Sequence, residues 1–385
     1  MVWGFSVGGF NDVWIRSPSY PASHPSNDLR FYKCEFSRFE SKARSIALTP
    51  LHPYGVERVN KRRFLLAAPS LLALSAWSVA GAARAAVNPK TRLVVADQSE
   101  LLRYLLDASG ERKRLGFQLE LPNFAGGPAI FEAIRAGALD IAYVGDTPPI
   151  QARAAGVNLP IIATFTRERA QYRLVQRAGA NIQQLSDLRG KRVSYVEGSG
   201  RQVFLIEALT RAGLKLGDVQ LVNLRVAELN DALRANAVDV AVLMEPHVTR
   251  LGKQIGATPV PDPQERNLLP ATSYIYARPE ALADAQKAEA IGEFLAAFVR
   301  AGKWSNANVP QWGRHYYTDF QRVDAESTAA ILASQSPLLF QTAAEARPHH
   351  QKLIDILHAA GTLPRRLDAA GSFATTYDRV IEAHR

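Results

Sequence analysis

The stretch YVGDTPPI, residues 143–150, joins an apolar run to an acid, a hydroxyl and two consecutive prolines. Proline fixes φ and lacks a backbone donor, so it is unsuited to a central strand but is tolerated in the first turn of a helix. The stretch therefore predicts a strand, a sharp loop and a helix start. It places Asp146 and Thr147 at the carboxyl end of the strand, where loops of open α/β sheets present side chains to ligands.

Short apolar strands alternate with longer amphipathic helices on both sides of this stretch. Strands are predicted at residues 92–96, 117–124, 140–145, 159–166, 172–176, 191–198, 219–224, 239–246 and 273–279. Helices are predicted at 99–110 with Ser99 as N-cap, and at 127–140, 148–156, 185–190, 199–214, 226–238 and 288–308. This alternation predicts an α/β protein whose mostly parallel sheets are flanked by helices.

The strands and helices form two series, and the first series resumes late in the chain. This order indicates two lobes joined by two hinge crossings. We expect residues 86–174 together with residues 275–385 to form lobe 1, and residues 175–274 to form lobe 2. The candidate crossings are the strands at 172–176 and 273–277.

Residues 56–85 have the pattern of a cleaved export signal. A Lys-Arg-Arg head at 61–63 precedes 20 uncharged residues, and Ala83-Arg84-Ala85 is a small-x-small cleavage pattern. The run at 62–66 also resembles a minimal twin-arginine motif, so the twin-arginine and general secretory routes both stay open. Export would place the mature protein in the periplasm.

Residues 1–55 precede this signal and show neither helical nor strand periodicity. We interpret them as a non-native or unstructured extension. The hypothesis is that translation begins near Val56 or Val59, and N-terminal sequencing of the precursor would test it.

The chain's formal charge of +10 is concentrated in its first section. Residues 86–385 contain 35 basic and 31 acidic residues, a net charge of only +4, with no basic helix or aromatic RNA-binding box. We therefore expect no nucleic-acid partner. The single cysteine, Cys34, also precedes residue 86, which excludes disulfides, thiolate zinc sites and a cysteine nucleophile from the mature chain.

Four loops combine small residues with a helix start, a pattern suited to anions because helix N-termini carry free N–H donors and partial positive charge. Gly198-Ser199-Gly200-Arg201 is the strongest anion cradle among them. Any one of these loops is also explained by ordinary capping and turn residues. The candidate ligand-binding residues are Gln98, Ser99, Gly126, Asp146, Thr147, Gly198, Ser199, Gly200, Arg201, Glu245 and His247.

Four motifs occurring in order, FAGGPA, GDTPPI, LSDLRGKRVSYVEGSG and DVAVLMEP, resemble the aliphatic sulfonate, taurine and nitrate group of ABC-transporter solute-binding proteins. The resemblance covers about residues 90–370. It implies a two-lobed periplasmic-binding-protein fold, not an enzyme, that closes on a small anion and delivers it to an ABC permease and its ATPase. We expect a monomer without cofactor.

In this interpretation the loop at 198–201 holds an anionic head, and Gln98, Ser99, Asp146 and Thr147 line the facing lobe. Glu245 and His247 would set selectivity. Where the sulfonate binders tend to carry Trp-Asp-Pro, this chain has Met244-Glu245-Pro246, so a flat aromatic wall becomes a flexible thioether. The true ligand is therefore open among organosulfonates, nitrate and a thiamine precursor.

Enzymes of the same fold are the main alternative, because Glu245 and His247 could act as a general acid and base. The desulfinase and thiamine-pyrimidine synthases of this fold imply a cysteine nucleophile or a cysteine-rich iron motif, which residues 86–385 lack. A sensory or scaffold role is a third possibility. His349 and His350, after Pro348, are interpreted as a solvated loop or helix start, and we expect no metal site.

Overall fold

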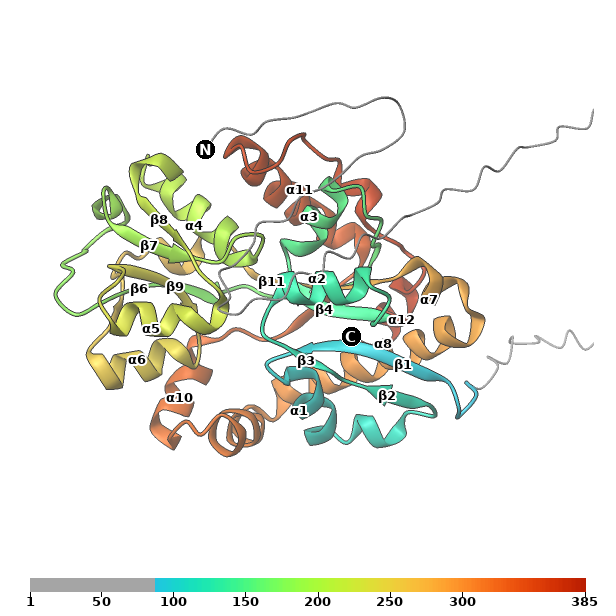
Figure 1. Ribbon diagram of the computed structural model, residues 1–385. Helices are drawn as coiled ribbons and strands as arrows, with labels where there is room; N and C mark the ends of the chain where they lie inside the picture. Colours follow the sequence, from blue (N-terminus) through green and yellow to red (C-terminus); the bar gives the residue numbers. More distant parts are fainter. Residues whose placement is uncertain (1–86) are drawn as a thin grey trace, which may run out of the picture. The chain divides into compact units, whose positions relative to one another are not determined.

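The computed structural model describes residues 87–385. The expectations for the extension at 1–55 and the export signal at 56–85 lie outside these residues, as does Cys34. Within the described part of the chain the strands form two sheets flanked by helices, which is the two-lobed α/β architecture expected from the sequence (Figure 1). Contacts join both lobes into one unit.

The sheet of lobe 1 is built from strands near both ends of the described chain. Across the sheet lie β12 (Leu339–Gln341), β5 (Ile161–Arg167), β11 (Ala271–Ala277), β4 (Ile141–Gly145), β1 (Arg92–Gln98) and β2 (Gln118–Glu120), while β3 (Asn123–Phe124) also pairs with β1. Strands β1 to β5 run in one direction, and β11 and β12 run in the other. The carboxyl ends of β1, β4 and β5 therefore share one edge of the sheet.

The sheet of lobe 2 is smaller. Its strands lie in the order β10 (Thr258–Pro259), β6 (Tyr172–Gln176), β9 (Val240–Met244), β7 (Arg192–Tyr195) and β8 (Gln220–Asn223). Only β6 runs against the others in this sheet. The strand predicted at 172–176 is thus fully paired with β9, and β11 is fully paired within lobe 1, so the chain crosses between lobes in the loops before them, at 168–171 and 268–270.

Helices cover the faces of both sheets. Lobe 1 contains α1 (Leu101–Ala108), η1 (Glu111–Arg114), α2 (Gly127–Arg135), α3 (Pro148–Ala154), α7 (Pro279–Ala283), α8 (Ala285–Ala307), α9 (Val309–Gly313), the π-helical η6 (Arg314–Phe320), α10 (Ala325–Ser334), α11 (Ala343–Ala359), η7 (Ala369–Ser372) and α12 (Asp378–His384). Lobe 2 contains η2 (Leu185–Leu188), α4 (Gly200–Arg211), η3 (Leu216–Asp218), η4 (Val226–Glu228), α5 (Leu229–Arg234), α6 (His247–Ile255) and η5 (Glu265–Asn267).

Apolar packing joins the lobes as well as filling each of them. One buried cluster combines Ile150 of α3, Val203 and Ile206 of α4, and Leu353 and Leu357 of α11. Helix α4 belongs to lobe 2, whereas α3 and α11 belong to lobe 1. Burial of these side chains removes apolar surface from water, and this stabilises the contact between the lobes along α4.

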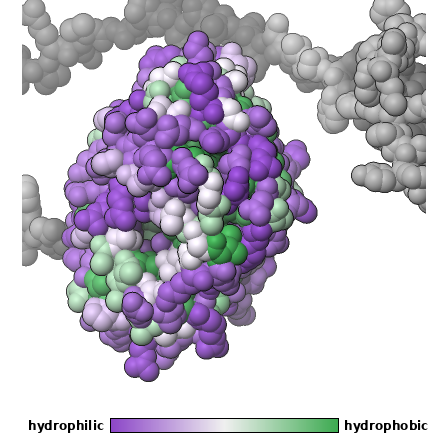
Figure 2. All heavy atoms as spheres, turned by 90° about the vertical axis from the view of Figure 1, so that its left-hand side faces the viewer, coloured by the Kyte–Doolittle hydropathy of each residue, from purple (hydrophilic) through white to green (hydrophobic). Residues whose placement is uncertain are grey.

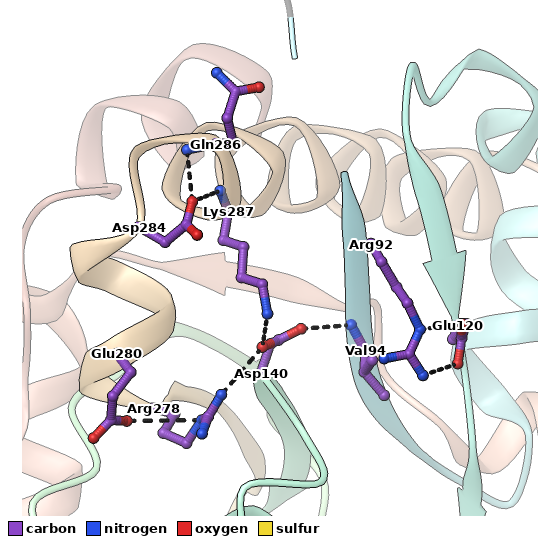
Figure 3. Close-up of polar contacts among 9 residues, drawn as sticks. All are labelled: Arg92, Val94, Glu120, Asp140, Arg278, Glu280, Asp284, Gln286 and Lys287. Carbon is purple, nitrogen blue, oxygen red and sulfur yellow. Dashed lines mark hydrogen bonds and ion pairs between the residues drawn. The ribbon is translucent and has the colours of Figure 1, made fainter. Parts of the chain in front are cut away.

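A charged network lies at the amino ends of the parallel strands of the lobe 1 sheet, opposite their carboxyl ends (Figure 3). The side chain of Asp140 is only 4% exposed, and its Oδ1 lies 2.6 Å from the Nζ of Lys287 and 3.5 Å from Nη2 of Arg278. Its Oδ2 accepts the N–H of Val94 at 2.9 Å. The carboxylate thus links β1, the start of β4 and α8. Replacement of a buried charge with this many partners is expected to destabilise the fold.

Two local expectations are wrong. Ser99 is not the N-cap of the first helix: α1 begins at Leu101, and the buried carboxylate of Asp97 accepts the N–H groups of Leu102 and Arg103 at 3.0 Å each. His349 and His350 lie inside α11 rather than in a solvated segment, and His350 is fully buried. In the first case the Asp97 carboxylate takes the place of the predicted cap, and in the second packing within lobe 1 buries His350.

Figure 2 looks onto the side of the molecule on which α4, α5 and α6 lie. Hydrophilic residues dominate this face, and apolar residues form small separate groups. Among the described residues, the large apolar side chains with substantial exposure are Leu221, Val309 and Leu339, which lie on three separate elements. None of the helices in residues 87–385 combines the length and the apolar character required to cross a bilayer.

Candidate functional site

A cavity of about 150 Å³ lies between the two lobes, beside the loops in which the chain crosses. Lobe 1 contributes the ends of β4, β5 and β11 together with α1 and the helices from α8 to α10, and lobe 2 contributes the start of β6 and the end of β9. The lining includes Tyr143, Phe165, Arg167, Ser273, Trp312, Tyr317 and Gln335 from lobe 1, and Arg173, Met244 and Glu245 from lobe 2. Arg169 and Arg266, on the loops near the crossings, also line it.

Arg167 is the half-buried last residue of β5. Its Nη1 donates to the carbonyl oxygen of Ser336, and within residues 87–385 its guanidinium forms no ion pair with a carboxylate. Burial lowers the pKa of Arg167, and the phenols of Tyr317 and Tyr143 oppose that shift. A guanidinium still carries its charge under these conditions, so the cavity contains a cation that no carboxylate of residues 87–385 pairs with.

Hydroxyl groups lie on the same side of the cavity. The Tyr317 hydroxyl accepts a hydrogen bond from Nε2 of Gln335 at 2.6 Å, and its own hydrogen has no acceptor within residues 87–385. Tyr143 and Ser273 line the same cavity. Burial raises the pKa of both phenols, so both stay protonated and can act as donors.

Aromatic rings form much of the lobe 1 wall. Tyr143 stacks on Phe165 with ring centroids 5.2 Å apart, and Trp312 stacks on Tyr316 with centroids 4.9 Å apart. Tyr316 is held in turn by its hydroxyl, which donates to the carbonyl oxygen of Ser99 at 2.9 Å. Each ring is thus fixed by a second group before any ligand arrives.

The lobe 2 wall is formed by the end of β9. Met244 presents a thioether, and Glu245 presents a carboxylate whose Oε2 accepts the N–H of Thr249, in the first turn of α6, at 3.1 Å. Arg173 is neutralised by the buried Glu265, at 2.5 Å. Arg169 and Arg266 are exposed, so the cavity lining carries more cationic than anionic groups, a distribution that attracts anions.

Most of the sequence-predicted site residues lie outside this cavity, and Glu245 is the one that lines it. Gln98 is the last residue of β1. Ser99 follows it and is exposed. Gly126 is buried at the start of α2, where an added Cβ would lie 3.1 Å from Cγ2 of Val226 in lobe 2. Their role as ligand contacts stays a prediction.

Asp146, Thr147 and the start of α4 meet at a contact between the lobes. Asp146 accepts a hydrogen bond from the Thr147 hydroxyl at 2.9 Å, and burial raises its pKa to about 6. Ser199 caps α4 by accepting the N–H of Arg201 at 3.3 Å, while its hydroxyl donates to Val196 at 2.7 Å. Gly198 precedes this turn with φ +70, which suits glycine.

Arg201 and His247 lie on the lobe 2 side of that contact. Arg201 is 4% exposed, its Nε donates to the carbonyl of Val242 at 3.2 Å, and its guanidinium carbon lies 5.2 Å from the centroid of the Tyr172 ring. Burial lowers the pKa of Arg201. Burial, reinforced by nearby arginines, also lowers the pKa of His247 to about 4, and its Nδ1 lies 2.7 Å from Nδ2 of Asn230.

Sequence reasoning missed Arg167, Tyr143, Tyr317 and Trp312. Arg167 ends an otherwise apolar strand at the edge where ligands bind, and this position is a usable signal. Tyr143 is the first residue of the stretch at 143–150. The alternation of side chains along a strand does not reveal whether the face that carries Tyr143 is turned towards the other lobe. The two C-terminal aromatic residues carry no local signal, because their place depends on how α9 and η6 fold back onto β5.

Comparison with known proteins identifies the family. A model of the NMT1/THI5-like family matches residues 113–309. A candidate aliphatic sulfonates-binding protein of Escherichia coli K12 is 30% identical over 158 residues, which are 41% of this chain and 49% of that protein. The chain therefore aligns with about half the length of this relative. A protein of Bacillus subtilis with the same name is 22% identical over 270 residues, 70% of this chain and 80% of the relative.

Solved structures support the same fold. The alkanesulfonate-binding protein SsuA from Xanthomonas axonopodis pv. citri, bound to MOPS, superposes with a TM-score of 0.65 at 20% identity. The match covers 75% of this chain and 99% of that one.

Proposed function

We propose that this chain, which belongs to the NMT1/THI5-like family, is an exported solute-binding protein. It captures a small organic anion, an organosulfonate, between its lobes and delivers it to the permease and ATPase of an ABC importer. The observation that carries the proposal is Arg167, a guanidinium in the interlobe cavity without a carboxylate partner in the described residues. The names of the relatives agree with a sulfonate as the anion.

A sulfonate suits the groups around Arg167. Its three oxygens accept hydrogen bonds in several directions, and the guanidinium and the phenols of Tyr317 and Tyr143 are donors. A half-buried charge without a counter-ion is unfavourable, so a bound anion would provide the missing counter-charge. The groups in this cavity bind and orient an anion, and the relatives from Escherichia coli and Bacillus subtilis are named as binding proteins rather than enzymes.

A second proposal, which can be tested separately, is that the start of α4 binds the anionic head. Arg201 and the loop at 198–201 lie outside the cavity lining, and the Arg201 guanidinium packs against the ring of Tyr172. Substitution of each arginine separates the two proposals, because only the guanidinium that holds the head should change the affinity strongly. Glu245, which faces the same cavity as Arg167, is proposed to select among sulfonates by the groups at their other end.

The test is isothermal titration calorimetry of the full chain with ethanesulfonate, benzenesulfonate, sulfate, nitrate and the pyrimidine precursor of thiamine. We expect binding of a sulfonate that is recovered unchanged. Arg167→Met should weaken that binding at least tenfold, about 1.4 kcal/mol, because a charge-assisted contact is lost.

Arg153→Met is the matched control. Arg153 also lies in lobe 1 and donates to a backbone carbonyl, that of Asp368, but it is not part of the cavity lining. Equal affinities for the Arg167 and Arg153 variants would overturn the assignment of Arg167. A large loss in Arg201→Met alone would favour the start of α4 instead. Binding of the thiamine precursor and no sulfonate would leave the fold and discard the ligand.

A further inference from the structure

We propose that the preferred ligand of the interlobe cavity is an aromatic sulfonate, with its ring against the wall formed by Tyr143, Phe165, Trp312 and Tyr317. The inference rests on the proposed function and narrows its ligand class. It follows from the shape and chemistry of the wall and not from the anionic head, which any sulfonate shares.

The rings of this wall are held rigidly. Phe165 is buried beneath Tyr143, and it also meets Phe298 edge-on with centroids 5.1 Å apart. Trp312 is buried and stacked on Tyr316 at an interplanar angle of 10°. A rigid aromatic surface binds a flat ring with little loss of side-chain freedom, whereas a flexible alkyl chain must itself be ordered on binding.

The π-helical segment η6 positions two consecutive tyrosines differently. Tyr316 packs behind the wall, between Trp312 and Phe320, and its hydroxyl reaches back to Ser99. Tyr317 instead lines the cavity, with its hydroxyl bonded to Gln335 of the segment after α10. π-Helical turns are uncommon and are frequent at functional sites, which agrees with a role for η6 in shaping the cavity.

The lobe 2 wall and the volume of the cavity also suit an aromatic sulfonate. Met244 faces the cavity from lobe 2, and a thioether makes favourable contacts with the edges of aromatic rings. The cavity volume of about 150 Å³ is comparable to that of protein cavities that hold benzene. The aromatic wall and Arg167 line one cavity, so the ring and the sulfonate of one small molecule can be bound together.

Benzenesulfonate and cyclohexanesulfonate make a matched pair, because they share the anionic head and the size of the ring and differ in aromaticity. We expect the full chain to bind benzenesulfonate about tenfold more tightly by calorimetry. Tyr317→Leu should reduce that ratio to about twofold, whereas Tyr317→Phe should retain the ratio because it keeps the ring, even if the loss of the hydroxyl weakens both ligands.

The comparison of ligands on the unaltered protein stands even if a variant fails to fold. Equal, measurable affinities for the two sulfonates would overturn the inference and leave the proposed function intact. Binding of neither sulfonate, nor of ethanesulfonate, would overturn the proposed function itself. A tenfold preference that persists in both Tyr317→Leu and Tyr143→Leu would show that the ring lies elsewhere and would overturn the assignment to this wall.

Discussion

Asp146 of lobe 1 lies so close to Gly200 of lobe 2 that any side chain at position 200 would force neighbouring side chains to move. A Cβ built on Gly200 would lie 2.9 Å from Oδ1 of Asp146 and 2.7 Å from the hydroxyl of Tyr172. Asp146 directly follows β4, and Gly200 is the first residue of α4, so the lobes meet at a carboxylate and a helix N-terminus. The partial positive charge of that terminus favours a carboxylate.

Gly200→Ala should therefore disturb the contact between the lobes. Overpacking of a well-filled site typically destabilises a protein by about 1–3 kcal/mol, and we expect a loss of that size in the free energy of unfolding. Urea denaturation followed by circular dichroism measures it. Gly217→Ala is the control, because nothing lies within 4 Å of a Cβ at that position. Equal urea midpoints for the Gly200 and Gly217 variants would mean that the lobes can move apart at Asp146 without a loss of stability.

The Asp140 network predicts a stability effect at the edge of lobe 1 remote from the cavity. Asp140→Asn keeps an acceptor for the N–H of Val94 but removes the charge that faces Lys287 and Arg278. We expect the free energy of unfolding to fall by about 2 kcal/mol, because the two cations are partly exposed and regain some hydration.

Glu120→Gln is the matched control for Asp140→Asn. Glu120 pairs with Arg92 on the same sheet, but both side chains are largely exposed (Figure 3). An exposed pair of this kind contributes little, so the urea midpoint should stay unchanged. Sulfonate affinity should also be unaffected in both variants. A midpoint in Asp140→Asn no lower than in Glu120→Gln would contradict a structural role for the buried network.

Much of the fold could be predicted from the sequence because its strands are short apolar runs with clear boundaries. The strand at 172–176 has the same limits as β6, and Ser199 caps α4 as its hydroxyl and the following glycine suggest. The first helix illustrates the limit of such signals. Ser99 had the right residue type for a cap, but the carboxylate of Asp97 reaches the free N–H groups instead, and only the three-dimensional position of the strand end decides between them.

The cavity was harder to predict because it is formed by segments distant in sequence. Trp312 and Tyr317 belong to the buried core of lobe 1, yet the same rings line the cavity. Arg167 and Glu245 lie on different lobes, and their shared cavity depends on the path of the crossing loops. Local patterns report which residues form a strand or helix, but they do not report which strand ends meet across two lobes.

The buried histidine of α11 predicts how stability depends on pH. His350 is fully buried, its Nδ1 lies 3.1 Å from the hydroxyl of Tyr274, and burial, reinforced by His349 and Arg153, lowers its pKa to about 3. The unfolded chain has an ordinary histidine pKa of about 6.5, so below that pH the unfolded state binds a proton that the folded state rejects. The contribution of His350 is therefore fully present above about pH 6.5 and declines by about 1.4 kcal/mol per pH unit towards pH 3.

Other buried groups titrate in the same interval and oppose one another. Burial lowers the pKa of His349 to about 4, which acts in the same direction as His350, whereas burial raises the pKa of Asp97 and Asp146 to about 6. These carboxyls gain protons in the folded state first, so they add stability as the pH falls below 6. A difference between variants isolates His350 from this background.

We expect His350→Asn to have a shallower pH dependence of stability than the unaltered protein. Urea denaturation between pH 5 and 6.5 should show a difference in slope of about 1 kcal/mol per pH unit, although the variant is less stable at pH 7 because it leaves a cavity. His358→Asn controls for the loss of an imidazole from α11 at an exposed position. If both variants change the slope equally, burial of His350 is not what couples the stability of this protein to pH.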